Sequence, residues 1–239
     1  MEFRAKTRAG ALLSLVLAAA APLAAQGMEF KARWKRAMRD AEGTFTVGSQ
    51  SLGFRSKDGK HDLRWQWSDV QQAFLSPWRL VVLSYHDTTA FLGRDRQFEF
   101  DRLPPEFPDR AYPEFHANLG ARLVAAIPGI EFPVVWKAPA KLLHQRGGPE
   151  GVLVVGEELI AFRSPEKEAS RFWWIKELDN ISRAGASDLT IVTGEKSNFI
   201  HFSPREFRFQ LKEPLAEERY TTLWHQLNRA KGLQRFPQP

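Results

Sequence analysis

The same order of hydrophobic and polar positions occurs twice along the chain. Residues i and i+108 are alike over a long stretch, and the first example is SLGFRS at Ser51–Ser56 against LIAFRS at Leu159–Ser164. The matched pairs are Gly43 with Gly151, Phe54 with Phe162, Trp65 with Trp173, Asp69 with Glu177, and Tyr112 with Tyr220. Apolar positions that stay in register over the length of a domain indicate an internal duplication. We therefore predict two units, residues 28–127 and 138–231, joined by a linker at 128–137.

Each unit reads as short strands followed by one helix. The run HDLRWQW alternates, which places Leu63, Trp65 and Trp67 on one face of a strand. The runs GTFTV, LGFRS, RLVVLSY and QFEFDR have the same strand-like character, and each has a counterpart in the second unit. The units close with amphipathic helices predicted at 112–127 and 215–232, the second ending at Gly232.

The positions of the tryptophans follow from these faces. The alternation and the helical stripes predict core positions for four of them: Trp65, Trp67, Trp173 and Trp224. Trp174 breaks the alternation, so we expect it on an outer face or at the contact between the units. Trp78 follows Pro77 and is predicted at a loop tip, either partly buried or as part of a binding surface.

The segment FKARWKRAMRDAE, residues 30–42, fits two patterns. As a strand it places Phe30, Ala32 and Trp34 inward, and as a helix it aligns Phe30 and Trp34 with alanines further on. The matching segment of the second unit contains Pro139 and two glycines, which a helix interior resists. This comparison favours the strand.

The complete pattern resembles the pleckstrin-homology-like superfold, particularly its bacterial and GRAM-type members. The stretch LRWQWSDVQQA carries most of the resemblance, because a tryptophan-bearing strand runs there into an acidic and an aliphatic residue. The resemblance covers nearly the whole chain after residue 27, once per unit. It implies a mainly β fold (α+β by content) of two partly open antiparallel barrels, each of seven strands and each capped by a C-terminal helix.

The N-terminal residues have the pattern of a bacterial signal peptide. Arg4, Lys6 and Arg8 precede an uncharged stretch at 11–25 that ends in small residues. We expect cleavage after Ala25 and export to the periplasm or the medium. The alternative is a retained N-terminal anchor, although the stretch is shorter than the roughly 20 residues of a membrane span. Residues 232–239 are expected to form a disordered tail.

The sequence contains no recognisable catalytic or metal-binding constellation. Cysteine is absent, and the six histidines show no ligand spacing. Nucleophile-elbow, phosphate-loop and dinucleotide-binding motifs are also absent. His86 and Asp87 form the only pair suited to acid–base chemistry, and a solvated turn explains them. Asp69 and Glu177 are expected to cap the turns that follow them. We therefore predict no enzyme activity, no cofactor and no metal.

The net charge of +6 is spread over the chain, with +1 on residues 26–132 and +3 on residues 133–239. These values argue against a nucleic-acid partner. The one local cluster has five cations in ten positions without an acidic residue: Lys31, Arg33, Lys35, Arg36 and Arg39. On an edge strand it could guard against pairing with another chain, or it could dock an anionic lipid, polymer or partner.

These observations lead to one main functional hypothesis. We expect an exported, non-enzymatic binding or scaffold protein whose tandem units engage a protein or another component of the cell envelope. The alternative is direct binding of an anionic lipid or polymer through the basic strand of the first unit, and a hydrolase with an unrecognised site is a remote third. The candidate binding residues are the five cations and Trp78, and the oligomeric state is left open.

Overall fold

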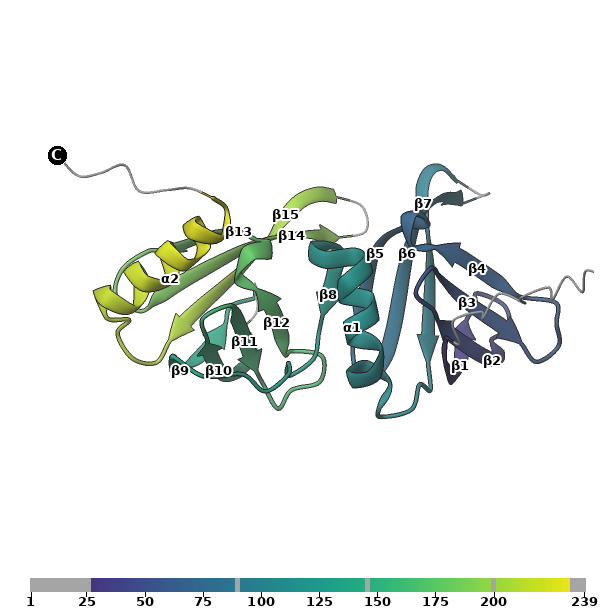
Figure 1. Cartoon of the computed structure of the whole chain (residues 1–239), viewed down its shortest axis with the longest axis horizontal. Coiled ribbons are helices and arrows are strands. Elements are labelled where there is room, and N and C mark those ends of the chain that lie inside the picture. Colours follow the sequence, from purple (N-terminus) through teal and green to yellow (C-terminus); the bar gives the residue numbers. More distant parts are fainter. Residues whose placement is uncertain (1–26, 89–90, 145–146, 199–200, 233–239) are drawn as a thin grey trace, which may run out of the picture.

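The computed structural model describes residues 27–88, 91–144, 147–198 and 201–232, and within them the chain forms two β units side by side (Figure 1). Residues 1–26 and 233–239 lie outside the described part, so the signal peptide and the tail predicted there are not addressed by the structure. No helix of the described part is long and apolar enough to cross a membrane.

Unit one consists of eight strands, two short 3-10 helices and one α-helix. Its strands are β1 (Met28–Lys35), β2 (Ala41–Val47), β3 (Ser51–Ser56), β4 (Leu63–Gln66), β5 (Val70–Leu75), β6 (Arg79–Thr88), β7 (Phe91–Asp101) and β8 (Leu123–Ala125). Its helices are η1 (Trp67–Asp69), α1 (Phe107–Leu119) and η2 (Gly120–Arg122).

Unit two repeats this order, and up to residue 232, where the described part ends, it has no counterpart of β8. Its strands are β9 (Trp136–Leu142), β10 (Glu150–Val155), β11 (Leu159–Arg163), β12 (Arg171–Trp174), β13 (Leu178–Arg183), β14 (Asp188–Asn198) and β15 (His201–Leu211). Its helices are η3 (Ile175–Glu177) and α2 (Glu217–Ala230). The strand β9 begins at Trp136, inside the range that the sequence assigned to the linker.

Apart from β8, the two sheets have the same strand order, as expected for two repeated units. The first sheet runs β4-β3-β2-β1-β7-β6-β5-β8 and the second β12-β11-β10-β9-β15-β14-β13. All neighbours pair antiparallel except β5 and β8. In the described residues no ladder joins β4 to β5 or β12 to β13, so each sheet is open at that corner. The chain is therefore mainly β, with two antiparallel sheets and a helix at the end of each unit.

The strand prediction for the N-terminal segment is confirmed, but its place in the sheet is not the expected one. In β1 the side chains of Phe30, Ala32 and Trp34 are buried. The whole strand pairs with β2, and its last three residues, Arg33 to Lys35, also pair with β7. The hypothesis of an edge strand is therefore wrong for Arg33 and Lys35, because both neighbouring positions are filled there.

The helix predicted at 112–127 is wrong beyond Leu119. Gly120 has φ +51°, which L side chains rarely adopt, and the α-helix ends there. The following apolar residues, Leu123–Ala125, form the strand β8 and add in parallel to the outer edge of β5. A run that is buried on all sides has no clear period, so helix and strand cannot be told apart in it by pattern.

The tryptophan predictions hold with one exception. Trp65, Trp67 and Trp173 are buried, and Trp174 lies at the unit–unit contact. Trp224 was expected in the core and is 41% exposed. On α2 only Leu223 and Leu227 are fully buried, so the stripe that faces the sheet is narrower than the sequence pattern indicated.

Apolar packing continues from one unit into the other. The core of unit one includes Leu159, Ala161 and Phe172, which belong to β11 and β12 of unit two. The connector packs closely on this contact, since a Cβ added at Gly129 would lie 2.3 Å from the Phe172 ring. Short, stiff connectors favour packed units over freely moving ones, and the structure shows such packing.

Candidate functional site

The basic strand β1 presents its cations on the outer face of the sheet. Strand alternation explains this, because Phe30, Ala32 and Trp34 occupy the inward positions between them. The outward residues are Lys31, Arg33 and Lys35, and Arg36 and Arg39 follow in the turn to β2. The structure therefore brings the five predicted cations to one end of unit one, and it also determines which of them already have acidic partners.

Arg33 is paired within the sheet. Its Nε and Nη2 donate to the two carboxylate oxygens of Asp101 at 2.7 and 2.6 Å, and its Nη1 lies 3.5 Å from Asp40. Bidentate pairs of this kind hold the guanidinium in a fixed geometry. The hydrogen bond from Arg33 lowers the pKa of Asp101, and the same bond raises the pKa of Arg33. Arg33 is thus not free to meet an external anion.

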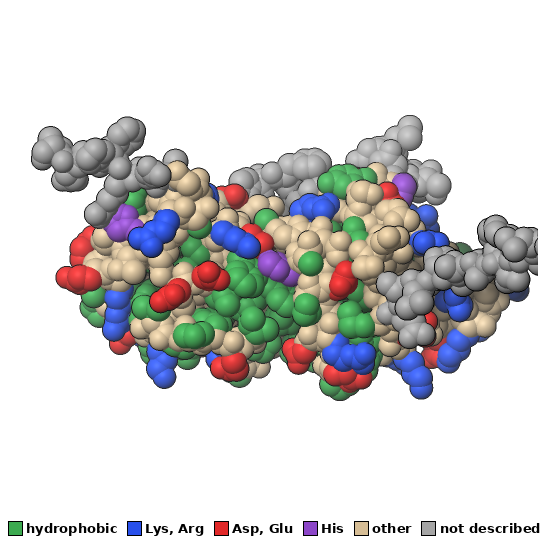
Figure 2. Space-filling view, in the orientation of Figure 1, with side chains coloured by type: hydrophobic (Ala, Val, Ile, Leu, Met, Phe, Trp, Pro, Cys, Tyr) green, Lys and Arg blue, Asp and Glu red, His purple; other side chains and the backbone are tan. Residues whose placement is uncertain are grey.

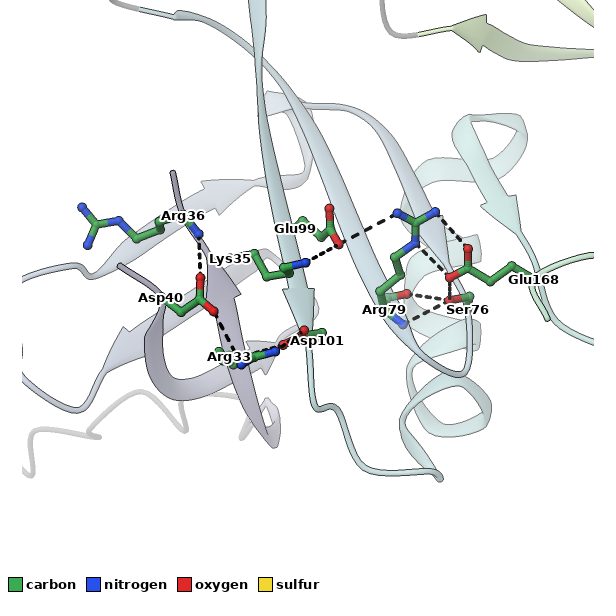
Figure 3. A network of polar contacts seen from close by, with 9 residues as sticks. All are labelled: Arg33, Lys35, Arg36, Asp40, Ser76, Arg79, Glu99, Asp101 and Glu168. Carbon is green, nitrogen blue, oxygen red and sulfur yellow. Dashed lines mark hydrogen bonds and ion pairs between the residues drawn. The ribbon is translucent and has the colours of Figure 1, made fainter. Parts of the chain in front are cut away.

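Lys35 belongs to a row of alternating charges that ends in unit two. Its Nζ lies 3.8 Å from Glu99, which lies 3.9 Å from Arg79. Arg79 in turn makes a bidentate pair with Glu168 of unit two, with both distances 2.9 Å. Figure 3 shows the whole row, together with Ser76, whose hydroxyl also reaches Glu168. Lys35 therefore takes part in the network that connects the two units.

Three of the predicted cations are more available. Lys31 and Arg39 are exposed and have no ion-pair partner within the part of the chain that the structure describes. The Arg36 guanidinium lies 5.0 Å from the centre of the Trp34 ring, and its backbone N–H donates to Asp40. An open hollow of about 590 Å³ lies beside Arg36 and Arg39, and carboxylates share its wall with cations. The charge there is mixed, not uniformly basic.

Trp78 lies on a turn, as predicted, with 45% of its surface exposed. The Nζ of Lys167 from unit two is 5.6 Å from its ring centre. Its backbone N–H and that of Arg79 both donate to the Ser76 hydroxyl, which orients the turn. Trp78 is therefore at the margin of the unit–unit contact, next to Arg79, which shares Glu99 with Lys35 of the basic strand.

A polar and aromatic cluster at the centre of the unit–unit contact was missed by sequence reasoning. Trp174 Nε1 donates to the Tyr112 hydroxyl at 2.9 Å, and the His116 ring stacks on Trp174 at 5.2 Å between ring centres. His116 Nε2 lies 2.8 Å from the Glu177 carboxylate. Burial raises the pKa of Tyr112 to about 12. The one available signal was Trp174, which stood outside the strand alternation.

The acidic residues at matched positions have different roles. Asp69 accepts a hydrogen bond from the Gln66 N–H at 2.8 Å, so it caps the 3-10 helix in which it lies and not, as predicted, the turn that follows it. Glu177, its counterpart, contacts His116 of the other unit, so the capping prediction is wrong there. The two units therefore differ at this matched position: Asp69 bonds within its own unit, and Glu177 contacts the other unit.

A second missed feature is a buried carboxylate near the same contact. Glu195 is 2% exposed and accepts a hydrogen bond from Trp173 Nε1 at 3.0 Å. Its Oε2 finds no hydrogen-bond donor in the described residues, and the Arg205 guanidinium lies 3.9 Å away. Burial raises the pKa of Glu195 and lowers that of the nearby Arg171 to about 10.

Two further surface features are a groove on unit two and an apolar face on the connector. A groove of about 740 Å³ lies between α2 and the β10–β11 turn, with Glu157, Glu158, Lys176 and Arg229 in its wall. The described residues contain no group of three or more acidic or histidine side chains placed to hold a metal ion.

Hydrophobic side chains gather on the face between the two units (Figure 2). The connector contributes three large apolar side chains that are each about half exposed: Ile130, Val134 and Val135. They are named here the connector face. Their burial is low although they lie beside the shared core, so this face is apolar and accessible.

Comparison with known proteins adds little to this description. No family model and no curated protein matches the chain. One similar solved structure is the C-terminal domain of an unknown protein from Leishmania infantum, with 11% identity, a TM-score of 0.31, and coverage of 38% of this chain and 80% of that chain. Another is the Spt16D Pob3N heterodimer, with 14% identity, a TM-score of 0.33, and coverage of 77% of this chain and 96% of that chain. At these scores neither likeness is used to argue what the chain binds.

Proposed function

We propose that the chain is an exported, non-enzymatic binding protein. Its two units are pleckstrin-homology-like barrels that act as one body and engage a protein partner through the connector face. The observation that carries the proposal is the group of half-exposed apolar side chains at Ile130, Val134 and Val135, beside the contact between the units. Figure 2 shows hydrophobic side chains gathered on the face between the units, and exposed apolar patches on a protein surface are typical of interaction sites.

The geometry of the connector supports a protein partner in preference to an anionic surface. The connector is held at both ends, by the Phe172 contact at Gly129 and by the bond from Val135 N–H to Val155 O at 2.8 Å. Its apolar side chains are therefore presented by a fixed backbone, which reduces the conformational entropy lost on binding. In contrast, Arg33 and Lys35 of the basic strand are already paired with Asp101 and Glu99.

The pleckstrin-homology-like assignment rests on topology. Two copies of a seven-stranded antiparallel order, each open at one corner and followed by a helix, are what the resemblance implies. Superfolds of this kind support many unrelated functions, so the function is argued from the surface and not from the fold.

The test uses residues 26–239, immobilised and exposed to envelope extract of the native host. A partner captured by the parent should be lost or reduced at least tenfold in the triple variant Ile130→Ser, Val134→Thr, Val135→Thr. The matched control is Tyr85→Ser, which removes an exposed apolar surface elsewhere on unit one. Equal capture by the triple variant and the parent, with both folded, would overturn the role of the connector face.

Export is tested separately by the intact mass of the protein purified from its native host. The proposal expects a mature chain that begins at or near Gln26. A mass that includes residues 1–25 would show that the N-terminal segment is kept, as a membrane anchor or within the cell.

A further inference from the structure

A small cavity lies between the two units. Its volume is about 20 Å³, room for about one water molecule, so the groups on its wall are largely shielded from solvent. Titratable side chains line it from both units, His116 on α1 and Glu195 on β14. The residues that η2 and β8 contribute to the wall are uncharged: Ala121, Leu123 and Ala125. Proton uptake or release at this wall therefore acts on the contact between the units.

The carboxylate of Glu195 is short of hydrogen-bond donors. The residue is 2% exposed, and Trp173 Nε1 donates to its Oε1 at 3.0 Å. Its Oε2 has no hydrogen-bond partner within the described part of the chain. A negative charge in such a place loses its hydration without a full replacement, whereas a protonated carboxyl group loses less. Burial accordingly raises the pKa of Glu195.

Two guanidinium groups oppose this effect of burial and do not cancel it. Arg171 of β12 and Arg205 of β15 both favour the ionised form of Glu195. Arg171 directs its Nη1 to the carbonyls of Glu168 and Ser170 at 2.7 Å each, and its Nε has no hydrogen-bond partner in the described residues. Its own burial lowers the pKa of Arg171 to about 10, although the Glu168 carboxylate acts against the shift. Burial thus remains the dominant influence on Glu195.

His116 responds to protonation in the same direction for a different reason. Its Nε2 lies 2.8 Å from the Glu177 carboxylate of unit two, and its ring stacks on Trp174 with an angle of 17° between the planes. A neutral imidazole makes a hydrogen bond there, whereas a protonated one makes an ion pair across the units. Imidazole is the side chain that ordinarily changes charge between pH 5 and pH 8.

The other titratable groups near His116 do not reverse this effect. Lys176 lies beside the same stack, with its Nζ 5.1 Å from the centre of the Trp174 ring. Tyr112 stays uncharged below pH 8, because burial raises its pKa to about 12. Glu177 is therefore the charge in hydrogen-bond contact with the imidazole among the described residues.

We propose that the contact between the units is a proton-dependent switch. Protons on Glu195 and His116 hold the units together at the cavity, and the loss of these protons at higher pH loosens the contact there. The stabilisation from Glu195 is complete below its ordinary pKa of 4.5 and is lost as the pH rises through its raised pKa. The switch lies in the fold itself and does not depend on a partner at the connector face.

Hydrogen exchange at two indole groups measures the contact. Trp174 Nε1 donates to the Tyr112 hydroxyl across the units at 2.9 Å, whereas Trp67 Nε1 donates to the Gly48 carbonyl inside unit one at 3.0 Å. Dividing the protection factor of Trp174 by that of Trp67 removes the general effect of pH on indole exchange. In folded residues 26–239 this ratio should be at least about threefold higher at pH 5 than at pH 8. Equal ratios at the two pH values would overturn the proposal.

Two single variants separate the contributions of the two groups. Glu195→Gln keeps an acceptor for Trp173 and is uncharged at every pH, so it should raise the ratio at pH 8. His116→Gln keeps a donor for Glu177 and cannot be protonated, so it should lower the ratio at pH 5 and leave it unchanged at pH 8. The matched control is His86→Gln, at an exposed histidine on β6, which should behave as the parent.

The variant with both substitutions should give one ratio at pH 5 and pH 8. A pH dependence that persists in it would assign the effect to other groups and reject the switch. A measurement on the parent needs no substitution at the buried sites. In a pH titration followed by NMR, the His116 ring protons and the Trp174 indole proton should shift with a common midpoint. Separate midpoints would contradict the role of His116.

Phe172 connects the switch to the connector. Its ring lines the cavity and also supports Gly129, where an added Cβ would lie 2.3 Å from it. Regulation of the connector face by pH is therefore a consequence that rests on the proposed function. Capture from envelope extract should be stronger at pH 5 than at pH 8 in the parent and equal in the double variant. Unequal capture by the double variant would overturn this consequence. No capture at either pH would count against the proposed function alone, because the indole ratio is measured without a partner.

Discussion

Gly43 and Gly151 show at the scale of single residues why the repeat could be recognised. A Cβ at Gly43 would lie 2.1 Å from the Arg55 carbonyl oxygen and 2.8 Å from Cζ of Phe54. A Cβ at Gly151 would lie 2.3 Å from the Arg163 carbonyl oxygen and 2.9 Å from Cζ of Phe162. Each glycine thus leaves space for a phenylalanine ring and a backbone carbonyl of the neighbouring strand. The recurring Gly and Phe-Arg-Ser positions are one packing arrangement used twice.

This arrangement predicts the same penalty in both units. Gly43→Ala and Gly151→Ala should each lower the free energy of unfolding by about 1–3 kcal/mol, because the new methyl group meets backbone that cannot move freely. The control is Gly53→Ala on β3, where the nearest atom lies at 3.8 Å. Urea unfolding measures all three variants. A Gly53 variant as unstable as the other two would show that loss of glycine, and not close packing, is responsible.

Glu195 has a predictable effect on the pH dependence of stability. Burial raises its pKa in the folded protein above the usual 4.5, so the folded state binds the proton more tightly than the unfolded state. The resulting stability is complete below about pH 4.5 and is lost as the pH rises through the raised pKa. Relative to Glu195→Gln, which keeps an acceptor for Trp173 and does not titrate, the parent should gain stability on acidification from pH 8 to pH 5. Parallel stability curves for parent and variant over this range would contradict the prediction.

The sequence predicts the inward or outward orientation of a side chain where neighbouring residues follow a local pattern. Alternation identified the inward residues of β1 and β4, because period two depends only on neighbours in the chain. It could not identify the partners of Arg33 and Lys35, since Asp101 and Glu99 lie on β7, more than sixty residues away. The basic cluster therefore looked like free charge in the sequence, whereas Arg33 and Lys35 are ion-paired in the fold.

Elements were predictable where a strand or helix had one buried face. The helix α2 and the strands β2 to β4 fall in this class. The segment from Gly120 to Ala125 does not, because β8 is covered by both units and all of its side chains are buried. A glycine inside a helical pattern was the one local sign that α1 ends there. The early end of α1 has a structural consequence, because the residues after it are free to form β8.

Trp65 on β4 and Trp173 on β12 occupy matching positions in the two units, and substituting each one tests the core of its unit. Trp65 packs against Phe98 at 4.7 Å between ring centres, and Trp173 packs against Phe207 at 4.8 Å. Trp65→Ala and Trp173→Ala should each cost about 3–5 kcal/mol of unfolding free energy. Trp224→Ala serves as the control, since its ring is 41% exposed, and its cost should stay below about 1 kcal/mol. A thermal midpoint that moves by only a degree or two in the first two variants would mean that these rings are not core residues.

At the scale of the whole molecule, the repeat of the two units could be predicted from the sequence, whereas the contact between the units could not. Repeated positions reveal what the units share, whereas the contact is made by residues in which they differ. Glu177 stands where unit one has Asp69. Trp174 of unit two corresponds to Gln66 of unit one, and His116 of unit one corresponds to Trp224 of unit two. These differences become informative only once the two units are placed beside each other.

The contact between the units predicts that they unfold together. Phe172 of unit two belongs to the core of unit one, so separating the units would expose apolar surface on both sides. Amide signals of Phe54 in unit one and Phe162 in unit two should therefore disappear at one urea midpoint. The hydrogen bond from Trp174 to Tyr112 should contribute a coupling of about 1 kcal/mol in a cycle of Tyr112→Phe and Trp174→Phe, because either change leaves a polar group of the other residue without its partner. Additive effects of the two changes, together with two separate midpoints in the parent, would show that the units touch without supporting each other. A single midpoint with measurable coupling would mean that the two units unfold as one cooperative body.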